Sequence, residues 1–443
     1  MTKSTKNKQY AIFYKSLHQA ANDSTSVALA QNPTEDKIAL IFRQHFSGKL
    51  LFAHKLGKWF AWTGNNWKNE ETGLAFDLAR TLARRNNGQS SARGGSASFA
   101  TGVVKMVKND PQFSVTGEKF DTDNYLLNTP GGTYDLRTGV KNDHRAEDYL
   151  TKMTAVAPSK RGGKRFLKFL KEVTGGDAQL EYYLKVALGS CLSGAVESNS
   201  IMFFTGNGRN GKNTLGDLVM YVMGEYAGMI PTSTLMAKTH ESHPTELAAL
   251  KGLRLAVSSE VNIGDHWNES RINQLTGDTQ ITGRFMRGDF FCFPRTHKHL
   301  IYGNHRPQIR SMTQALKSRI LIIPFKQSFA GREDTNLAEM LRLEAGFVLD
   351  WLIDGHMEWI RLGRKLPPCE AVENETAEYF SAQSTVEMWI DERCDLVGTD
   401  NLPSSKLTQS SLLYTDYHKW KQDRCELPVS MMIWSETMKA KFK

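Results

Sequence analysis

Residues 201–214 read Ile-Met-Phe-Phe-Thr-Gly-Asn-Gly-Arg-Asn-Gly-Lys-Asn-Thr, an apolar run followed by a glycine-rich loop that contains a lysine. The apolar run predicts a buried β-strand, and residues 215–223 predict an amphipathic helix directly after the loop. Glycines let successive backbone N–H groups face a phosphate, and the N-terminus of the helix offers its positive end to the same anion. We therefore expect a phosphate-binding loop, with a plain glycine-rich turn as the alternative.

The spacing of this loop matches that of a nucleoside triphosphate site. Four residues separate Gly206 from Gly211, and Lys212 follows directly. This is the spacing of a P-loop, in which the lysine reaches the β- and γ-phosphates of the nucleotide. We expect ATP and Mg²⁺ as cofactors. The position after the lysine normally supplies a hydroxyl to Mg²⁺, but here it is Asn213, with Thr214 one place later, so both stay candidate metal ligands. The predicted ATP-binding residues are Gly206, Asn207, Gly208, Asn210, Gly211, Lys212, Asn213 and Thr214.

A P-loop needs an acid at the end of a neighbouring buried strand. Residues 253–258 form a short, largely apolar run, and Glu260 follows near its end, where ligands gather in open parallel sheets. We predict that Glu260 is the catalytic acid and a third candidate for holding Mg²⁺. A surface glutamate at a strand end is the alternative.

Two further polar residues flank apolar runs. Asn304 follows the run 299–303 and is expected to orient the attacking water near the γ-phosphate. Arg319 precedes the run 320–325, and an arginine there can reach the γ-phosphate of a neighbouring subunit. A salt-bridged arginine at a strand entry is the alternative for Arg319.

A predicted hairpin lies between the acid and the asparagine. Its tip, around residues 284–290, combines arginines with Phe and Met, which suits a phosphate backbone and base faces. The candidate DNA contacts are Arg284, Arg287 and Lys298. An ordinary surface hairpin whose Phe residues face the core is the alternative.

Composition narrows the class of protein. The chain has 443 residues, which suits two or three domains, and a formal net charge of +9, which favours a polyanionic partner. Its five cysteines form no CxxC pair, which argues against a disulfide framework and a zinc site. No apolar stretch is long enough to span a bilayer, and residues 1–16 lack a signal-peptide core, so we expect a cytoplasmic protein without a membrane partner.

In this order, the motifs resemble those of the superfamily 3 helicases of phages, plasmids and mobile islands, the phage/plasmid primase-helicases. The matching segments are 206–214, 259–260, 275–278, 284–287, 303–307 and 319–325, with further likeness at 126–128, 135–139 and 414–420. The resemblance implies a ring-forming AAA+ ATPase, usually hexameric, that moves 3′→5′ on single-stranded DNA. By position, Glu260 is similar to the Walker B acid, Asn304 to sensor 1, Arg319 to the arginine finger, and Arg287 with its neighbours to the pore hairpin.

The chain departs from the family pattern at three places. Asn213 replaces the usual hydroxyl residue, and Asn273 and Gln274 stand where a lysine usually precedes Leu-Thr-Gly. These changes bear on the rate of ATP hydrolysis rather than on nucleotide binding. About 200 residues precede the P-loop and show no cluster of metal-binding carboxylates or cysteines, so we do not expect primer synthesis by this chain.

The predicted fold class is α/β: an AAA+ P-loop parallel sheet with helices, a small N-terminal α/β domain and a C-terminal helical, winged-helix-like domain. The predicted parts are a flexible tail (1–35), an N-terminal α+β domain (36–158), the helicase domain (159–345, with its P-loop core at 199–329), a helix and linker (346–370) and the C-terminal domain (371–443). A protein-docking bundle is the alternative for the last part.

The leading functional hypothesis is an ATP-dependent, ring-forming DNA helicase for the replication of a phage, plasmid or mobile island. Its expected partners are single-stranded DNA, replication-fork or origin DNA, further copies of itself in a homo-hexamer, and a separate primase or polymerase. The alternative is an origin-binding initiator or loader that uses ATP for assembly. A small-molecule phosphotransferase is a third class, but no acceptor pocket is readable from the sequence.

Overall fold

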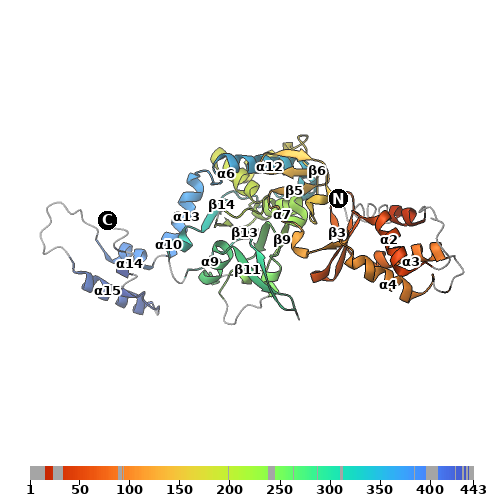
Figure 1. Cartoon of the computed structure of the whole chain (residues 1–443). Helices are drawn as coiled ribbons and strands as arrows, with labels where there is room; N and C mark the ends of the chain where they lie inside the picture. The colour runs from red at the N-terminus through yellow and green to blue at the C-terminus, as the bar shows by residue number, and fades with distance from the viewer. Residues whose placement is uncertain are drawn as a thin grey trace.

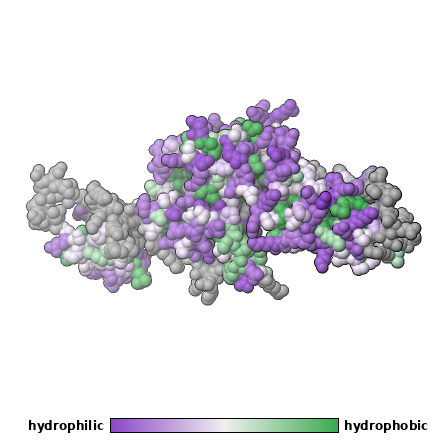
Figure 2. Space-filling view, viewed as in Figure 1, coloured by the Kyte–Doolittle hydropathy of each residue, from purple (hydrophilic) through white to green (hydrophobic). Residues whose placement is uncertain are grey.

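The computed structural model describes residues 15–22, 33–87, 92, 94–197, 199–237, 245–262, 264–286, 288–309, 313–383, 385–395, 408–424, 426–431, 434–435 and 438. The molecule is elongated, with N-terminal helices at one end, a mixed α/β body in the middle and two C-terminal helices at the other end (Figure 1). Hydrophilic residues cover most of the visible surface of the central body (Figure 2). Among the described helices, none is both long and apolar enough to cross a bilayer.

The central body is built on a five-stranded parallel sheet. Its strands, in spatial order, are β14 (Ile320–Pro324), β8 (Ile201–Thr205), β13 (Lys298–Gly303), β10 (Leu255–Ser259) and β9 (Ala227–Met229). Helices cover both faces, so strands β8 and β13 are buried along their whole length. This burial explains why they read as continuous apolar runs rather than as an alternating pattern.

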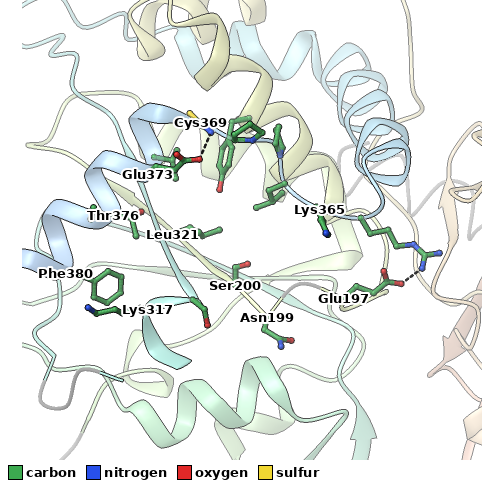
Figure 3. Close-up of a pocket in the computed structure, with 18 of the residues that line it drawn as sticks. Glu197, Asn199, Ser200, Lys317, Leu321, Lys365, Cys369, Glu373, Thr376 and Phe380 are labelled. Atoms are coloured by element: carbon green, nitrogen blue, oxygen red, sulfur yellow. Dashed lines mark hydrogen bonds and ion pairs between the residues drawn. The ribbon is translucent and has the colours of Figure 1, made fainter. Parts of the chain in front are cut away.

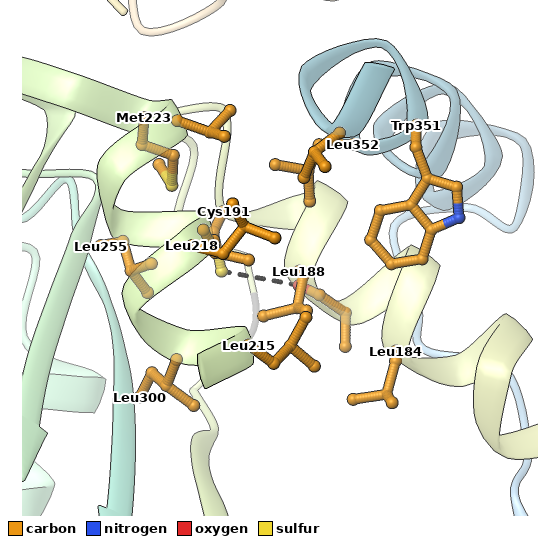
Figure 4. Packing of buried hydrophobic residues seen from close by; sticks show 14 of the residues in the cluster. Leu184, Leu188, Cys191, Leu215, Leu218, Met223, Leu255, Leu300, Trp351 and Leu352 are labelled. Atoms are coloured by element: carbon orange, nitrogen blue, oxygen red, sulfur yellow. Dashed lines mark hydrogen bonds between the residues drawn. The ribbon is translucent and has the colours of Figure 1, made fainter. Parts of the chain in front are cut away.

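One face of the sheet packs against five helices. These are α5 (Lys164–Thr174), α6 (Ala178–Ser190), α7 (Lys212–Met223), α11 (Leu337–Leu343) and α12 (Ala345–Arg361). Leucines of α6, α7 and α12 meet in one core (Figure 4). Helices α6 and α12 approach so closely that a Cβ on Gly189 would lie 2.5 Å from the backbone N of His356, and one on Gly355 2.1 Å from the carbonyl of Lys185. Glycine is required where these helices touch.

The other face is covered by a second set of helices and by a hairpin. They are α8 (Thr245–Ala248), α9 (Glu269–Gly277), α10 (Gln314–Lys317), α13 (Glu370–Gln383) and the hairpin of β11 (Gln280–Arg284) and β12 (Phe290–Pro294). Tyr379 and Phe380 of α13 are buried in the same cluster as Ile320 and Ile322 of β14. Helix α13, which we assigned to the C-terminal domain, therefore packs on the central sheet.

The N-terminal region forms a second α/β unit. Three helices, α2 (Glu35–Phe46), α3 (Leu74–Asn87) and α4 (Ala97–Asn109), pack with a sheet of order β3 (Trp67–Glu70), β2 (Lys58–Trp62), β1 (Leu50–Ala53) and β4 (Ser114–Val115). The spacing of apolar residues predicts a helix at 35–46 and the aromatic run predicts a strand at 58–62, and both are present with these bounds. Residues 15–22 are helical too, within the predicted tail, where the sequence allows a helix at 9–21.

A third sheet corrects the predicted boundary near residue 158. Its strands are β5 (Leu126–Thr129), β6 (Gly132–Asp135) and β7 (Val140–Asn142). The predicted N-terminal domain, 36–158, includes these strands, yet Leu127 and Leu136 are buried in the core shared by α6, α7 and α12. Arg254, just before β10, donates to the carbonyls of Leu126 (2.7 Å) and Leu192 (2.6 Å). These contacts tie the hairpin to the central body.

Two connecting segments differ in outcome. The basic run 160–165 has the composition of a linker, but its last two residues, Lys164 and Arg165, begin α5. Residues 346–370 were predicted to be a helix and linker, and α12 is followed by an irregular stretch from 362 to 369. Helix α12 lies within the core against α6. Five short 3₁₀ helices complete the regular structure: η1 (His54–Leu56), η2 (Gly117–Lys119), η3 (Ala146–Asp148), η4 (Gly224–Tyr226) and η5 (Thr232–Thr234).

The C-terminal end is a small helical unit. Helices α14 (Thr385–Arg393) and α15 (Ser410–Asp423) meet in a cluster of aromatic residues that includes Trp389, Tyr417 and Trp434. After β14 the described part of the chain contains helices and no strand, so the expected wing has no counterpart among the described residues. The sequence also predicts a helix at 435–442 in this domain, and most of that segment lies outside the described residues.

The core between α6, α7 and α12 leads to a stability prediction. Leu352→Ala removes a fully buried side chain and is expected to lower the free energy of unfolding by about 2–5 kcal/mol, because a cavity remains among rigid neighbours. Chemical unfolding followed by circular dichroism measures this. Leu343→Ala, at a highly exposed position, is the control and should change stability by less than about 0.5 kcal/mol. Equal effects of both variants would contradict this description of the core.

Candidate nucleotide site

The glycine-rich loop joins the end of β8 to the start of α7, as predicted. Gly208 and Gly211 have φ angles of +85° and +84°, in the left-handed region that favours glycine. A Cβ on Gly206 would lie 2.0 Å from Nδ2 of Asn210 and 2.4 Å from the carbonyl O of Phe325. The loop can therefore close over its own backbone only because glycine stands at these positions.

The N-terminus of α7 forms the second half of the loop. Lys212 is the first helical residue, and the cap position, Gly211, has no side chain to accept from the first turn. The first helical hydrogen bond runs from the N–H of Leu215 to the carbonyl of Gly211 (3.0 Å). The preceding N–H groups have no acceptor within the helix and point along its axis, which is the arrangement that binds an anion.

Lys212 lies inside the loop and not on the surface. Its Nζ donates to Oδ1 of Asn304 (2.6 Å) and to the carbonyl of Gly206 (3.2 Å). Burial lowers the pKa of Lys212, and these oxygens stabilise its charge instead of a carboxylate. Because neutral oxygens hold the ammonium, an anionic phosphate is a stronger partner than either of them.

Three neighbouring strands end at the same level around this lysine. In the paired register, Gly303 at the end of β13 lies beside Thr205 at the end of β8, and Tyr302 lies beside Ser259 at the end of β10. Asn304 and Glu260 are the next residues on their strands. The structure thus brings Lys212, Asn304 and Glu260 to the carboxyl edge of the sheet, the edge at which ligands of open parallel sheets bind.

Glu260 has an unusual backbone. Its φ of 64° is in the left-handed region, and its N–H donates to the carbonyl of Tyr302 (3.2 Å). Such a conformation costs on the order of 1 kcal/mol for a residue other than glycine and is concentrated at functional sites. The carboxylate is exposed at the carboxyl edge. This placement fits the predicted role of Glu260, which remains a prediction.

The donors predicted for Mg²⁺ are one carboxylate, one amide and one hydroxyl. Asn213 is exposed and Thr214 partly exposed in the first turn of α7, and Glu260 is exposed at the same edge. Within the described ranges, no three His, Cys, Asp or Glu side chains gather into a group that could hold a metal by themselves. This set fits Mg²⁺, which binds through one or two protein oxygens together with substrate phosphates.

Arg319 lies at the opposite edge of the sheet. It precedes β14, whose first residue pairs with Ile201 at the start of β8, so the length of a strand, about 17 Å, separates it from the phosphate loop. Its Nε donates to Oγ1 of Thr276 (2.9 Å) and its Nη1 to the carbonyl of Ala315 (2.8 Å). Among the described residues, no carboxylate forms a salt bridge with Arg319. This differs from the alternative in which Arg319 is a salt-bridged arginine at a strand entry. Arg319 cannot serve the phosphate loop of its own chain in this arrangement.

The predicted hairpin is present, and its tip is apolar and exposed. Phe285, Met286 and Phe290 have exposed fractions of 54%, 76% and 61%. The alternative of core-facing Phe residues holds for Phe291 and Phe293, which pack against the core beneath the hairpin. The Nε of Arg284 donates to the carbonyl of Gly288, and its guanidinium lies 5.2 Å from the centre of the Phe290 ring. Arg287, the other predicted arginine, lies outside the described residues.

Lys298 is not a surface residue, and its prediction as a DNA contact is wrong. It begins the central strand β13 and is 4% exposed. Its Nζ donates to the carbonyl of Ser190 (2.9 Å), the last residue of α6, and to the carbonyl of Ala195 (2.8 Å), in the segment that follows. Burial lowers its pKa to about 8. Lys298 satisfies backbone carbonyls that have no partner at the end of a helix, so it has a structural role.

A pocket of about 1000 Å³ lies at the amino edge of the sheet, the edge that carries Arg319. Ser200 and Lys317, from the sheet side, face Thr376 and Phe380 of α13 across it (Figure 3). The sequence did not indicate this pocket, because its walls come from segments that are separate in the chain, mainly 197–200, 317–321 and 364–381.

Sequence reasoning also missed a buried carboxylate next to the phosphate loop. Glu375 of α13 binds the guanidinium of Arg306 and lies 3.0 Å from Nζ of Lys326. The Nε of Arg306 donates to Oγ1 of Thr205, the last residue of β8 (3.2 Å). Nothing in the sequence pairs Glu375 with Arg306, since 69 residues separate them and only the packing of α13 on β14 brings them together.

Two family models match the chain. The first, described as D5 N terminal like, matches residues 39–175. The second, described as a family of unknown function (DUF5906), matches residues 204–319. The second match therefore begins at the end of β8 and includes Glu260 and Asn304, at the carboxyl edge of the sheet. It ends at Arg319, at the amino edge.

Several viral proteins are similar in sequence. A provisionally named helicase of Acanthamoeba polyphaga mimivirus is 27% identical over 272 residues, which are 59% of this chain and 27% of that protein. A provisionally named helicase of Invertebrate iridescent virus 6 is 24% identical over 62% of this chain and 28% of that protein. A provisionally named primase of African swine fever virus is 22% identical over 73% of this chain and 36% of its own length. The chain thus spans 27% to 36% of the length of these relatives.

Two solved structures of the C-terminal region of NrS-1, both described as apo, are similar in fold. One has a TM-score of 0.49 at 12% identity and covers 81% of this chain and 83% of that chain. The other has a TM-score of 0.49 at 11% identity and covers 87% of this chain and 86% of that chain.

The position of Lys298 leads to a prediction that separates its structural role from DNA binding. Lys298→Ala is expected to lower the free energy of unfolding by about 2–5 kcal/mol, because two buried carbonyls lose their donor. Arg284→Ala, at the exposed hairpin, should leave stability within about 0.5 kcal/mol of wild type. Thermal and chemical unfolding of both variants measure this. A Lys298→Ala protein of wild-type stability would contradict the structural assignment.

Proposed function

This chain belongs to the primase-helicase proteins of phages and viruses, and from that premise we propose that it is an ATP-dependent motor of DNA replication. The observation that carries the proposal is the hydrogen bond from Lys212 to Asn304. It lies at the edge of the sheet where strands β8, β13 and β10 end side by side. It supports a site in which a triphosphate replaces Asn304 as the partner of Lys212. Asn304 is then released to orient the attacking water.

In the proposed site each residue has a distinct task. The N–H groups at the start of α7 bind the phosphates, and Lys212 neutralises charge on the β- and γ-oxygens. Asn213 or Thr214, together with Glu260, would hold Mg²⁺, and the ion would supply positive charge to the phosphates. Glu260 also polarises the water that attacks the γ-phosphate.

We further propose an AAA+ ring, expected to be a homo-hexamer, that moves 3′→5′ on single-stranded DNA. The position of Arg319 supports this, because an arginine at the amino edge of one subunit can reach the carboxyl edge of the next in a head-to-tail assembly. Phe285, Met286 and Phe290 at the hairpin tip are exposed and suit contact with base faces, and Arg284 suits contact with phosphates. Arg287 stays a proposed phosphate contact from its position in the sequence, because it lies outside the described residues. A separate primase or polymerase is the further proposed partner.

The structure favours neither of the other two hypotheses. The large pocket lies at the edge opposite the phosphate loop, so it does not present an acceptor to a γ-phosphate as a small-molecule phosphotransferase would need. An initiator or loader would bind origin DNA through the C-terminal unit, and the described part of that unit contributes two helices without a wing.

Loss of Lys212 tests the nucleotide site. Lys212→Ala is expected to lower kcat/KM for ATP hydrolysis at least about 100-fold, because the charge that meets the developing negative charge is removed. Phosphate release measures this. Lys168→Ala, an exposed lysine on the neighbouring α5, is the matched control and should keep wild-type turnover. Undiminished hydrolysis by the Lys212→Ala protein would refute the site.

Mixing two inactive variants tests the shared site. Arg319→Ala alone is expected to be as inactive as Lys212→Ala, although each protein keeps one intact half of the site. Equal mixing should restore about a quarter of wild-type ATPase activity, because in a random head-to-tail ring one interface in four joins an intact phosphate loop to an intact arginine. Steady-state hydrolysis of the re-assembled mixture measures this. An absence of recovery, with mixed particles verified by mass, would show that Arg319 does not act across the interface.

A further inference from the structure

Helix α13 is bonded along its length to the segment that follows Asn304. The carboxylate of Glu375 binds Arg306, the hydroxyl of Tyr379 donates to the carbonyl of Pro307, and Oε1 of Gln383 accepts from the N–H of Ile309 (3.2 Å). The three α13 residues are spaced four apart, so they lie on one face of the helix. The segment 304–309 and α13 are therefore expected to move as one body.

The same segment touches the phosphate loop on its other side. Asn304 binds Lys212 (2.6 Å), and Arg306 donates to Thr205, directly before Gly206 (3.2 Å). A second route reaches Glu375 from the loop, because Nδ2 of Asn210 donates to the carbonyl of Phe325 (3.1 Å). The next residue, Lys326, lies 3.0 Å from Glu375.

Glu375 joins these two routes in a buried place. Its side chain is 6% exposed and lies between two cations. Burial acts to raise its pKa, but hydrogen bonds from Lys326 and Arg306 outweigh this and hold the pKa below its ordinary value. The carboxylate therefore stays ionised at neutral pH. Breaking one side of such a buried pair is strongly unfavourable, so movement of Arg306 is expected to carry Glu375 with it.

Helix α13 continues almost directly into the C-terminal unit. It ends at Gln383, and α14 begins at Thr385, so a single residue separates the two helices. Helices α14 and α15 share their own aromatic cluster, distinct from the clusters that contain the central sheet. A displacement of α13 would therefore change the position of this small unit relative to the nucleotide site.

We propose that α13 transmits the state of the nucleotide site to the C-terminal helices α14 and α15, with Glu375 as the positioning residue that links α13 to the phosphate loop through Arg306 and Lys326. This rests on the proposed function, because a triphosphate that takes Lys212 from Asn304 supplies the displacement. The segment 304–309 then shifts, and α13 follows through Glu375, Tyr379 and Gln383.

A purely structural role for the same contacts is the competing explanation. Thr376 accepts from the N–H of Ile322 (2.9 Å), and Tyr379 is buried against the sheet, so α13 would remain attached to β14 without Glu375. A structural clamp changes stability equally with and without nucleotide. A transmitting contact changes how the C-terminal helices respond to nucleotide, and this difference can be measured.

The test uses the full chain with two fluorescent dyes, attached to genetically encoded unnatural amino acids. One replaces Lys168 on α5 and the other replaces Ser411 on α15, and both positions are exposed. Energy transfer is recorded without nucleotide, with ADP and with a non-hydrolysable ATP analogue. In the otherwise unmodified chain the analogue is expected to shift the transfer efficiency. Glu375→Gln keeps the volume but loses the charge, so it should bind the analogue within about threefold of the unmodified chain and lose the shift.

Glu358→Gln makes the same change of charge in a carboxylate that pairs with Arg361 on its own helix, α12, so it is the control and should keep the full shift. Gln383→Ala removes a less central contact of the same face and should reduce the shift. If the Glu375→Gln protein does not fold, Gln383→Ala serves as the test variant in its place. A full shift in Glu375→Gln, or in Gln383→Ala when the first variant is unfolded, would overturn the inference. So would the absence of any shift in an unmodified chain that binds the analogue. An unmodified chain that does not bind the analogue would instead refute the proposed function.

Discussion

The pairing of β13 between β8 and β10 is the constraint on which the candidate site depends. Parallel strands in register must end together, so the residues that follow them are neighbours in space although they are far apart in the chain. Asn304 meets Lys212 for this reason, and Glu260 lies at the same edge. A shift of β13 by one residue would turn its side chains to the opposite faces and break this meeting.

Local features were predictable from the sequence because they depend on neighbours in the chain. The strand, glycine loop and helix at 201–223 follow from apolar runs and glycine positions, and the structure has them where expected. Glu260, Asn304 and Arg319 could be placed at strand ends for the same reason. Their relative positions required the order of the strands, and this placed Arg319 at the edge away from Lys212.

What the sequence could not predict depends on long-range packing. Lys298 follows a polar run and looked exposed, yet the end of α6 covers it and its charge serves carbonyl groups. The hairpin at 126–135 and α12 have patterns that fit a small domain or a linker equally well, and only the shared core assigns them to the central body. Glu375 stood out in no motif, because its importance comes from two cations on other segments.

The buried cations have a consequence for the proposed binding of nucleic acids. Arg254, Arg295 and Lys298 count toward the formal charge of +9, but each is at most 8% exposed and donates to oxygens inside the protein. Only a cation that reaches a phosphate displaces a condensed counterion. The dependence of nucleic-acid binding on ionic strength should therefore reflect fewer positive charges than the composition indicates. The positions of the exposed cations should affect this dependence more than the total charge of the chain.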